Sequence, residues 1–145
     1  MSVEAIMTQS VLSVGPSATV REAIRLLEDS EIRHLLVVED GQLVGIVSDR
    51  DLREYRIPLM LEADADQASR RAEAILDTAV SEVMASDVVA VDSSESVLSV
   101  IDAMIEYKVG AVPVIDRHSD ELLGIVSYVD VLRYARALLV ENEGD

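Results

Sequence analysis

Two short segments carry the residue types best suited to binding a small polar ligand. Gly45-Ile46-Val47-Ser48 precedes Asp51, and Gly124-Ile125-Val126-Ser127 precedes Asp130. Each reads as an apolar strand that runs directly into a helix. A helix start presents free backbone N–H groups that attract anions, and a carboxylate held there suits the two hydroxyls of a vicinal diol. In the alternative interpretation, each Ser only caps its helix and each Asp is a favourable acid in the first turn.

The composition argues against catalysis and against metal binding. The 145 residues include no Cys, which excludes disulfides, thiolate nucleophiles and zinc-thiolate sites. The two His residues, His34 and His118, lie far apart, and no nucleophile with a base and an orienting partner is recognisable. No calcium-loop spacing is present. We therefore expect no enzyme, no catalytic residue and no metal site.

The charge of the chain also limits its partners. A formal net charge of −16 repels nucleic acid and anionic membranes, so neither is an expected partner. No apolar run approaches the roughly 18 residues of a membrane span. Residues 1–7 lack the pattern of a signal peptide, so we expect a cytoplasmic location. The acidity fits either a high-salt habitat or an ordinary acidic protein that avoids aggregation.

The chain contains an internal repeat. An offset of 77 residues aligns Met7 with Met84 and Val37 with Val114, and an offset of 79 then aligns Asp51 with Asp130. A repeat of this length, present twice, indicates two units that bury their faces against each other.

Each copy predicts the order strand, helix, strand, strand, helix. The expected strands are residues 11–14, 35–39 and 43–48 in the first copy, and 88–91, 112–116 and 122–127 in the second. The first helices show apolar residues at helical spacing, with Thr19 and Ser96 as N-caps and Ser17 and Ser94 as rivals. The final helices should start near Asp49 and near Tyr128. This pattern gives an α/β (α+β) fold with a tight hairpin at residues 39–42 and a longer one at 117–121.

A connector separates the copies. Pro58 interrupts it, and residues 61–76 are rich in helix-forming residues with few apolar positions, which predicts a mostly solvated helix. The acidic tail, residues 141–145, is expected to fray.

Three ordered segments in each copy resemble the cystathionine β-synthase (CBS) domain family, whose members occur in tandem pairs. They are the openings Ala5-Ile6-Met7-Thr8 and Glu82-Val83-Met84-Ala85, the middle segments 32–38 and 109–115, and the two Gly-Ile-Val-Ser-x-x-Asp endings. The resemblance implies a first CBS repeat at residues 1–57, a helical connector at 58–79 and a second repeat at 80–140. It also implies that two β-α-β-β-α repeats pack with pseudo-two-fold symmetry.

The resemblance further implies two ligand clefts between the repeats. They would hold AMP, ADP, ATP or S-adenosylmethionine, with the Asp on the ribose hydroxyls and the Ser near the sugar or phosphate. Cleft one would be lined by Met7, Leu12, Ile32, Arg33, His34, Ser127 and Asp130. Cleft two would be lined by Ser48, Asp51, Met84, Val89, Val109, Gly110 and Ala111.

The two clefts should differ in charge. Cleft one has the basic pair Arg33-His34, and an Arg binds phosphate bidentately. Cleft two has Gly110-Ala111 there and would depend on Arg50 or Lys108. We therefore expect a phosphorylated nucleotide to prefer cleft one. In the alternative interpretation, Arg33 is a surface residue paired with a nearby acid.

The expected function is a stand-alone regulatory module that binds an adenosyl ligand and changes its shape or its affinity for an unknown protein target. The resemblance implies no obligatory cofactor and a homodimer, for which Leu132, Leu138 and Leu139 could supply an apolar surface. The alternative is a structural or dimerisation module with degenerate clefts.

Overall fold

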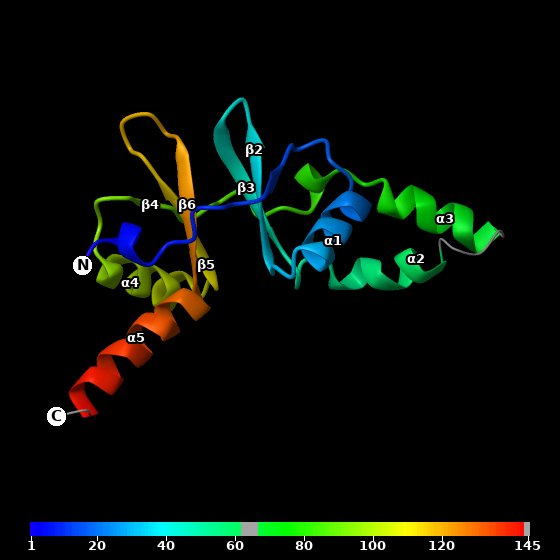
Figure 1. The fold of residues 1–145 in the computed structure, drawn as a ribbon. Coiled ribbons are helices and arrows are strands. Elements are labelled where there is room, and N and C mark those ends of the chain that lie inside the picture. Colours follow the sequence, from blue (N-terminus) through cyan, green and yellow to red (C-terminus); the bar gives the residue numbers. More distant parts are fainter. Residues whose placement is uncertain (62–66, 144–145) are drawn as a thin grey trace. The chain divides into compact units, whose positions relative to one another are not determined.

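The structure is a computed structural model that describes residues 1–61 and 67–143. Two three-stranded sheets and their helices form a mixed α/β fold (Figure 1). The elements are η1 (Val3–Ala5), β1 (Ser13–Val14), α1 (Val20–Asp29), β2 (His34–Glu39), β3 (Gln42–Ser48), η2 (Arg53–Tyr55), α2 (Arg56–Leu61), α3 (Gln67–Leu76), η3 (Val80–Glu82), β4 (Val91–Asp92), α4 (Val97–Tyr107), β5 (Ala111–Ile115), β6 (Leu122–Ser127) and α5 (Tyr128–Glu143).

The chain divides into two compact units that interleave in the sequence. The N-terminal unit is Leu12–Asp87, and the C-terminal unit combines Met1–Val11 with Val88–Asp145. The opening segment of the chain thus packs with the elements of the second repeat. In the C-terminal unit, Thr8 and Ile125 form an antiparallel bridge with N–H to O distances of 2.8 and 3.0 Å. Ala85 and Ile46 form the corresponding bridge in the N-terminal unit.

Both units have the same sheet topology. In each, a two-residue strand pairs in parallel with the middle strand, which pairs antiparallel with the third. In the N-terminal unit, Asp40 and Gly41 form a two-residue hairpin loop with φ of 52° and 79°. Positive φ at both positions is typical of the mirror-image turn whose twist matches the flanking strands, so the predicted tight turn is confirmed.

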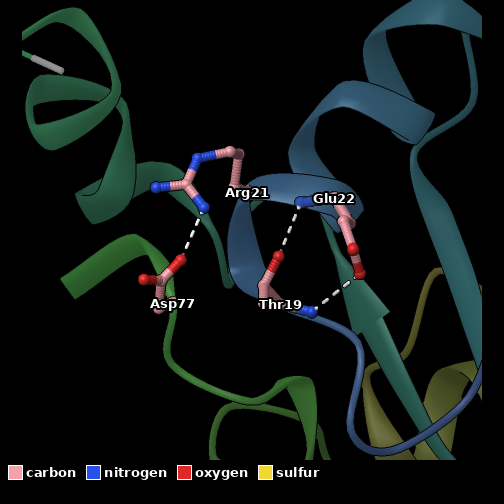
Figure 2. Close-up of polar contacts among 4 residues, drawn as sticks. All are labelled: Thr19, Arg21, Glu22 and Asp77. Carbon is pink, nitrogen blue, oxygen red and sulfur yellow. Dashed lines mark hydrogen bonds and ion pairs between the residues drawn. The ribbon is translucent and has the colours of Figure 1, made fainter. Parts of the chain in front are cut away.

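The first helix of each repeat begins where the sequence predicts. Thr19 caps α1 by accepting a hydrogen bond from the Glu22 N–H (3.2 Å), and Glu22 accepts one in return from the Thr19 N–H (3.0 Å; Figure 2). Ser96 caps α4 in the same way, accepting from the Ser99 N–H at 3.2 Å. These caps satisfy N–H groups that have no partner inside the helix, and Ser17 and Ser94 are not the caps.

The predicted final helices differ between the repeats. α5 starts at Tyr128 as expected and extends through Glu143, beyond the helix expected from the sequence. The prediction of a helix from Asp49 is wrong, because residues 49–52 form turns and the regular helix α2 starts only at Arg56. A helix running on from Asp49 would place Pro58 in its interior, where proline lacks the N–H and clashes with the preceding turn. Starting at Arg56 puts Pro58 in the first turn, where it is tolerated.

The connector helix α3 is exposed at most of its described positions, as the sequence predicts, and it buries two residues. α3 lies beside α2 (Figure 1), and it buries Ala72 and Leu76, the latter in the core of the N-terminal unit. After α3 ends, the Asp77 carboxylate forms an ion pair with Arg21 of α1, with Oδ1 at 2.6 Å from Nη1 (Figure 2). Residues 62–66, part of the helix predicted for 61–76, lie outside the described residues.

Each unit has its own apolar core, built almost entirely from aliphatic side chains. In the N-terminal unit, α1 packs on one face of the sheet through Val20, Ala23, Ile24 and Leu27, against Leu35, Val37 and Val47. The core of the C-terminal unit comprises Val3, Val91, Val100, Val112, Val114 and Val126. Each strand that ends at Ser48 or Ser127 is therefore anchored by the buried valine just before that Ser, Val47 in β3 and Val126 in β6.

Candidate functional site

The two Ser-x-x-Asp endings have the same local hydrogen bonding. The Ser48 N–H donates to Asp51 Oδ2 (2.9 Å), and the Asp51 N–H donates to Ser48 Oγ (3.2 Å). The Ser127 N–H donates to Asp130 Oδ2 (2.9 Å), and the Asp130 N–H donates to Ser127 Oγ (3.3 Å). Capping is therefore the local role of all four residues. It also fixes each carboxylate at the start of a turn or helix, with the capping bonds on Oδ2.

Strand pairing brings a second residue pair to each ending. His34 is paired with Ser48 across β2 and β3, and Ala111 is paired with Ser127 across β5 and β6. The Asp49 N–H donates to the Arg33 carbonyl (2.8 Å), as the Tyr128 N–H does to the Gly110 carbonyl (2.9 Å). Two matched sets result. The Ser48 end comprises Arg33, His34, Ser48, Asp49, Arg50 and Asp51, and the Ser127 end comprises Gly110, Ala111, Ser127, Tyr128, Val129 and Asp130.

The electrostatics of the Ser48 end centre on His34. Burial lowers the pKa of His34, while the Asp51 carboxylate acts to raise it and Arg33 acts to lower it further. The imidazole is thus half-buried and lies within the field of both a carboxylate and a guanidinium group. Asp51 itself is exposed to solvent.

The Ser127 end has a less exposed carboxylate. The Asp130 side chain is only 12% exposed, and its Oδ2 also accepts a hydrogen bond from Ser127 Oγ (3.2 Å). Arg133, one turn further along α5, places Nη1 at 4.0 Å from Asp130 Oδ1. The corresponding residue of the first repeat is Glu54, so this ion pair belongs to the second repeat alone.

The methionines of the two opening segments lie against the strands that lead to these endings. Met7 contacts Gly124 in β6, and Met84 contacts Gly45 in β3. A Cβ on Gly124 would lie 2.7 Å from the Thr8 carbonyl oxygen and 3.0 Å from Met7 Sδ. Both glycines are therefore needed for the close approach of the opening segment.

The remaining predicted residues are distributed over both units. Leu12 is 39% exposed, and its carbonyl accepts from the Leu36 N–H (3.4 Å). Ile32 and Val109 pack against the cores of their own units, and Val89 is half-buried. Lys108, considered for a phosphate, is the C-cap of α4 in the left-handed conformation (φ 55°).

Each predicted cleft combines residues of both units. In the N-terminal unit, the structure brings together Arg33, His34, Ser48 and Asp51, with Met84 on the strand that leads to Ser48. In the C-terminal unit, it brings together Gly110, Ala111, Ser127 and Asp130, with Met7 on the strand that leads to Ser127. The grouping into cleft one and cleft two stays a prediction.

Sequence reasoning overlooked Tyr128, Val129 and Arg133. Tyr128 and Val129 are 40% and 37% exposed and stand where the first repeat has Asp49 and Arg50. A comparison of the two repeats position by position at the x-x residues would have found the difference. This difference in residue type can be interpreted only because the two ends share one backbone arrangement.

In residues 1–61 and 67–143, no helix has the length and hydropathy needed to cross a membrane. Within the same ranges, His, Asp and Glu side chains form no group of three or more able to hold a metal ion.

The chain is similar to several curated proteins. The CBS domain protein YhcV of Bacillus subtilis is 30% identical over 130 residues, which are 90% of this chain and 82% of that protein. The arabinose 5-phosphate isomerase KdsD of Francisella tularensis is 29% identical over 135 residues, 92% of this chain. This chain spans only 37% of the isomerase, so the similarity covers part of that protein.

Solved structures share the fold over nearly the whole chain. A Vibrio cholerae structure assigned to acetoin utilization (AcuB) gives a TM-score of 0.76 at 28% identity, covering 100% of this chain and 97% of the other. CBSX2 in complex with AMP gives 0.75 at 26% identity, covering 94% and 97%. The CBS domain pair of MJ0100, in complex with 5′-methylthioadenosine and S-adenosyl-L-methionine, gives 0.74 at 25% identity, covering 94% and 97%.

The family comparison matches both repeats separately. The family described as CBS domain matches residues 3–57 and again residues 80–137. Both matches contain a complete β-α-β-β segment and one of the Ser-x-x-Asp endings. The chain therefore belongs to the CBS domain family as a tandem pair.

Proposed function

We propose that this protein is a regulatory module that binds an adenosyl ligand and passes the binding signal to another protein. The observation that carries the proposal is the pair of Ser-x-x-Asp ends, in which capping hydrogen bonds hold a carboxylate in a fixed position. A preorganised carboxylate binds a ribose diol without first losing side-chain freedom. The complexes of CBSX2 with AMP and of MJ0100 with two adenosyl compounds support the ligand class.

The ligand would be AMP, ADP, ATP or S-adenosylmethionine, with Asp51 and Asp130 on ribose hydroxyls and Arg33 and His34 on phosphate. Ligand binding acts on the protein only through different affinities for two conformations. Binding and release would therefore be the whole chemistry, with no catalytic step and no obligatory cofactor. We place this activity in the cytoplasm.

Output through self-association is part of the proposal. α5 exposes Leu132 (59%), Leu138 (44%) and Leu139 (60%), and α4 exposes Leu98 (63%) and Ile105 (71%). Exposed apolar side chains gathered on two adjoining helices are typical of surfaces that become covered. A homodimer through these helices is the expected assembly, and sedimentation of the wild type and a Leu132→Glu/Leu139→Glu variant tests it.

A ligand panel tests the proposal directly. Thermal unfolding is followed with AMP, ADP, ATP and S-adenosylmethionine at millimolar concentration. A ligand at 100 times its Kd stabilises the folded protein by about 2.7 kcal/mol, which is readily measured. Asp130→Asn keeps an acceptor for the Ser127 N–H and removes the charge, so it should abolish the shift at its end. Glu143→Gln at the far end of α5 is the matched control.

A structural or dimerisation module is the second candidate function. It is favoured by the capping hydrogen bonds, which give every Ser and Asp of the two ends a role without any ligand. The absence of a shift with every compound of the panel would favour it over ligand sensing.

A further inference from the structure

The first helices of the two repeats differ in what covers them. In the N-terminal unit the connector holds α1: the Arg21 guanidinium forms an ion pair with Asp77 at 2.6 Å (Figure 2), and α3 contributes to the core in which Ile24 is buried. The equivalent positions of α4, 77 residues further on, are Leu98 and Ile101. Leu98 is exposed and Ile101 is only half-buried. The face of α1 that the connector holds is therefore open on α4.

The open face of the C-terminal unit carries two rows of apolar side chains, one on α4 and one on α5, and these two helices contact each other. Each row has alternating spacings of three and four residues, which place it on one side of its helix and are typical of helices that pack along their length. The α4 row is Leu98, Ile101 and Ile105, and the α5 row is Tyr128, Leu132, Ala135 and Leu139.

The first repeat has charged residues where these rows are most exposed. The equivalents of Leu98, Ile105 and Leu132 are Arg21, Glu28 and Arg53. The apolar face thus belongs to the second repeat, and the covering that the connector gives to α1 has to come from outside the C-terminal unit.

The charges beside the rows favour a second copy of this chain as the cover. Residues 131–140 of α5 contain two Arg and no acid, on a chain with 28 acidic residues. Repulsion between two copies of net charge −16 is therefore reduced along this stretch. The acids of α5 lie nearer its ends, at Asp130, Glu141 and Glu143.

The two helices also carry complementary charges. Exposed Asp102 directly follows Ile101 in α4, and exposed Arg136 directly follows Ala135 in α5. Residues that flank an apolar row in this way form ion pairs between packed helices. If α4 of one copy lies against α5 of another, Asp102 opposes Arg136, and two-fold symmetry makes this pair twice.

We propose that a second copy of this chain covers the open face of the C-terminal unit, with α4 of each copy packed against α5 of the other. The N-terminal unit, whose equivalent face the connector holds, stays outside the contact. Both copies use the same surface, so the assembly closes at two. This inference rests on the homodimer of the proposed function and adds which unit pairs and which helices oppose each other.

Sedimentation equilibrium of the full chain measures the Kd of the dimer. Leu98→Glu/Ile105→Glu should raise this Kd by roughly a hundredfold or more, because two buried apolar contacts are lost and two charges are added. Ile57→Glu/Met60→Glu is the matched control, since it makes the same exchange at two exposed residues of α2 in the N-terminal unit. The control should leave the Kd close to that of the wild type.

Charge reversal tests how the helices are opposed. Asp102→Arg and Arg136→Asp should each raise the Kd by about tenfold, because each places like charges together. An equimolar mixture of the two variants should regain the affinity of the wild type. In the mixed dimer each α4 again faces an α5 of opposite charge, which a pair within one copy cannot achieve.

Other results overturn the inference. Equal dissociation by Ile57→Glu/Met60→Glu would show that the N-terminal unit takes part, and a mixture no tighter than its components would show that α4 does not face α5. A dimer that Leu132→Glu/Leu139→Glu dissociates and Leu98→Glu/Ile105→Glu does not keeps the homodimer and removes only this inference. If the wild type is a monomer, the homodimer of the proposed function fails as well, whereas ligand binding is decided by its own panel.

Discussion

Met7 lies directly against Gly124, although the two residues are separated by most of the chain. The Thr8 and Ile125 backbones form a bridge at the same place, and they hold the opening segment on the edge of β6. Met84 and Gly45 repeat the relationship in the N-terminal unit. In each unit, a glycine in the strand that leads to the Ser-x-x-Asp ending thus leaves room for the opening segment of a repeat to lie close against that strand.

Gly124→Ala should destabilise the protein by about 1–3 kcal/mol, because the new methyl group would lie 2.7 Å from the Thr8 carbonyl oxygen. Gly45→Ala should cost less, since its nearest neighbours are atoms of the flexible Met84 side chain. Gly15→Ala is the control, as a Cβ there meets nothing within 4 Å. Urea unfolding measures all three, and equal effects at Gly124 and Gly15 would contradict the predicted contact.

The elements whose signals are local were predictable from the sequence. Thr19 and Ser96 cap their helices because each precedes an apolar run and accepts from the N–H three residues on. The Asp40-Gly41 turn is set by two residues that tolerate positive φ. Such features depend on neighbours in sequence, so a single chain suffices to find them.

The features that the sequence did not predict depend on residues further along the chain. The helix expected from Asp49 gives way to turns because Pro58, nine residues further on, cannot lie in its interior. α3 is exposed at most of its described positions, as its composition predicts, but the burial of Leu76 in the core was not predicted. At the site, the sequence shows that Arg50 and Val129 differ. Only the matched backbone hydrogen bonds at Asp49 and Tyr128 show that these two residues occupy equivalent positions.

Asp130→Ala should cost more stability than Asp51→Ala. Asp130 is half-buried and lies in the first turn of a 16-residue helix, whereas Asp51 is exposed in a run of short turns. Loss of a helix cap costs about 1 kcal/mol, and the effect grows when the cap is shielded from water. Chemical denaturation in the absence of ligand measures both variants. A larger loss at Asp51 would show that the longer helix does not depend on its cap.

Asp92 should titrate well below an ordinary aspartate. The Ser94 hydroxyl and the backbone N–H groups of Arg117 (2.8 Å) and Ser94 (3.0 Å) donate to its carboxylate and lower the pKa of Asp92 from 3.8 to about 2. Because the folded pKa is lowered, the contribution of Asp92 to stability is present above pH 3.8 and is lost as the pH falls towards 2. Carbon-detected NMR titration measures this pKa.

Ser94→Ala should return the Asp92 pKa towards its ordinary value, since the Ser94 hydroxyl is the largest cause of the shift. Ser93→Ala is the matched control, because Ser93 contributes its backbone N–H to Ile115 (3.0 Å) and keeps it as Ala. An Asp92 pKa that does not move in Ser94→Ala would exclude the hydroxyl as the cause.

The folded protein should lose stability as the pH falls through the range in which His34 protonates. Burial lowers the pKa of His34 below 6.5, so the neutral imidazole is favoured in the folded state. The stability it supports is complete above pH 6.5 and declines as the pH falls below that value towards the folded pKa. The slope reaches at most about 1.4 kcal/mol per pH unit and is smaller here, because the side chain is only half-buried. Urea unfolding at pH 7.5, 6.5 and 5.5 measures it.

His34→Gln should flatten this pH dependence, whereas His118→Gln, in the exposed hairpin loop, should leave it as in the wild type. Asp51→Asn should steepen it, because the Asp51 carboxylate acts to raise the pKa of His34 and so favours the protonated form. The opposite sign in Asp51→Asn would mean that Asp51 and His34 do not share one electrostatic environment.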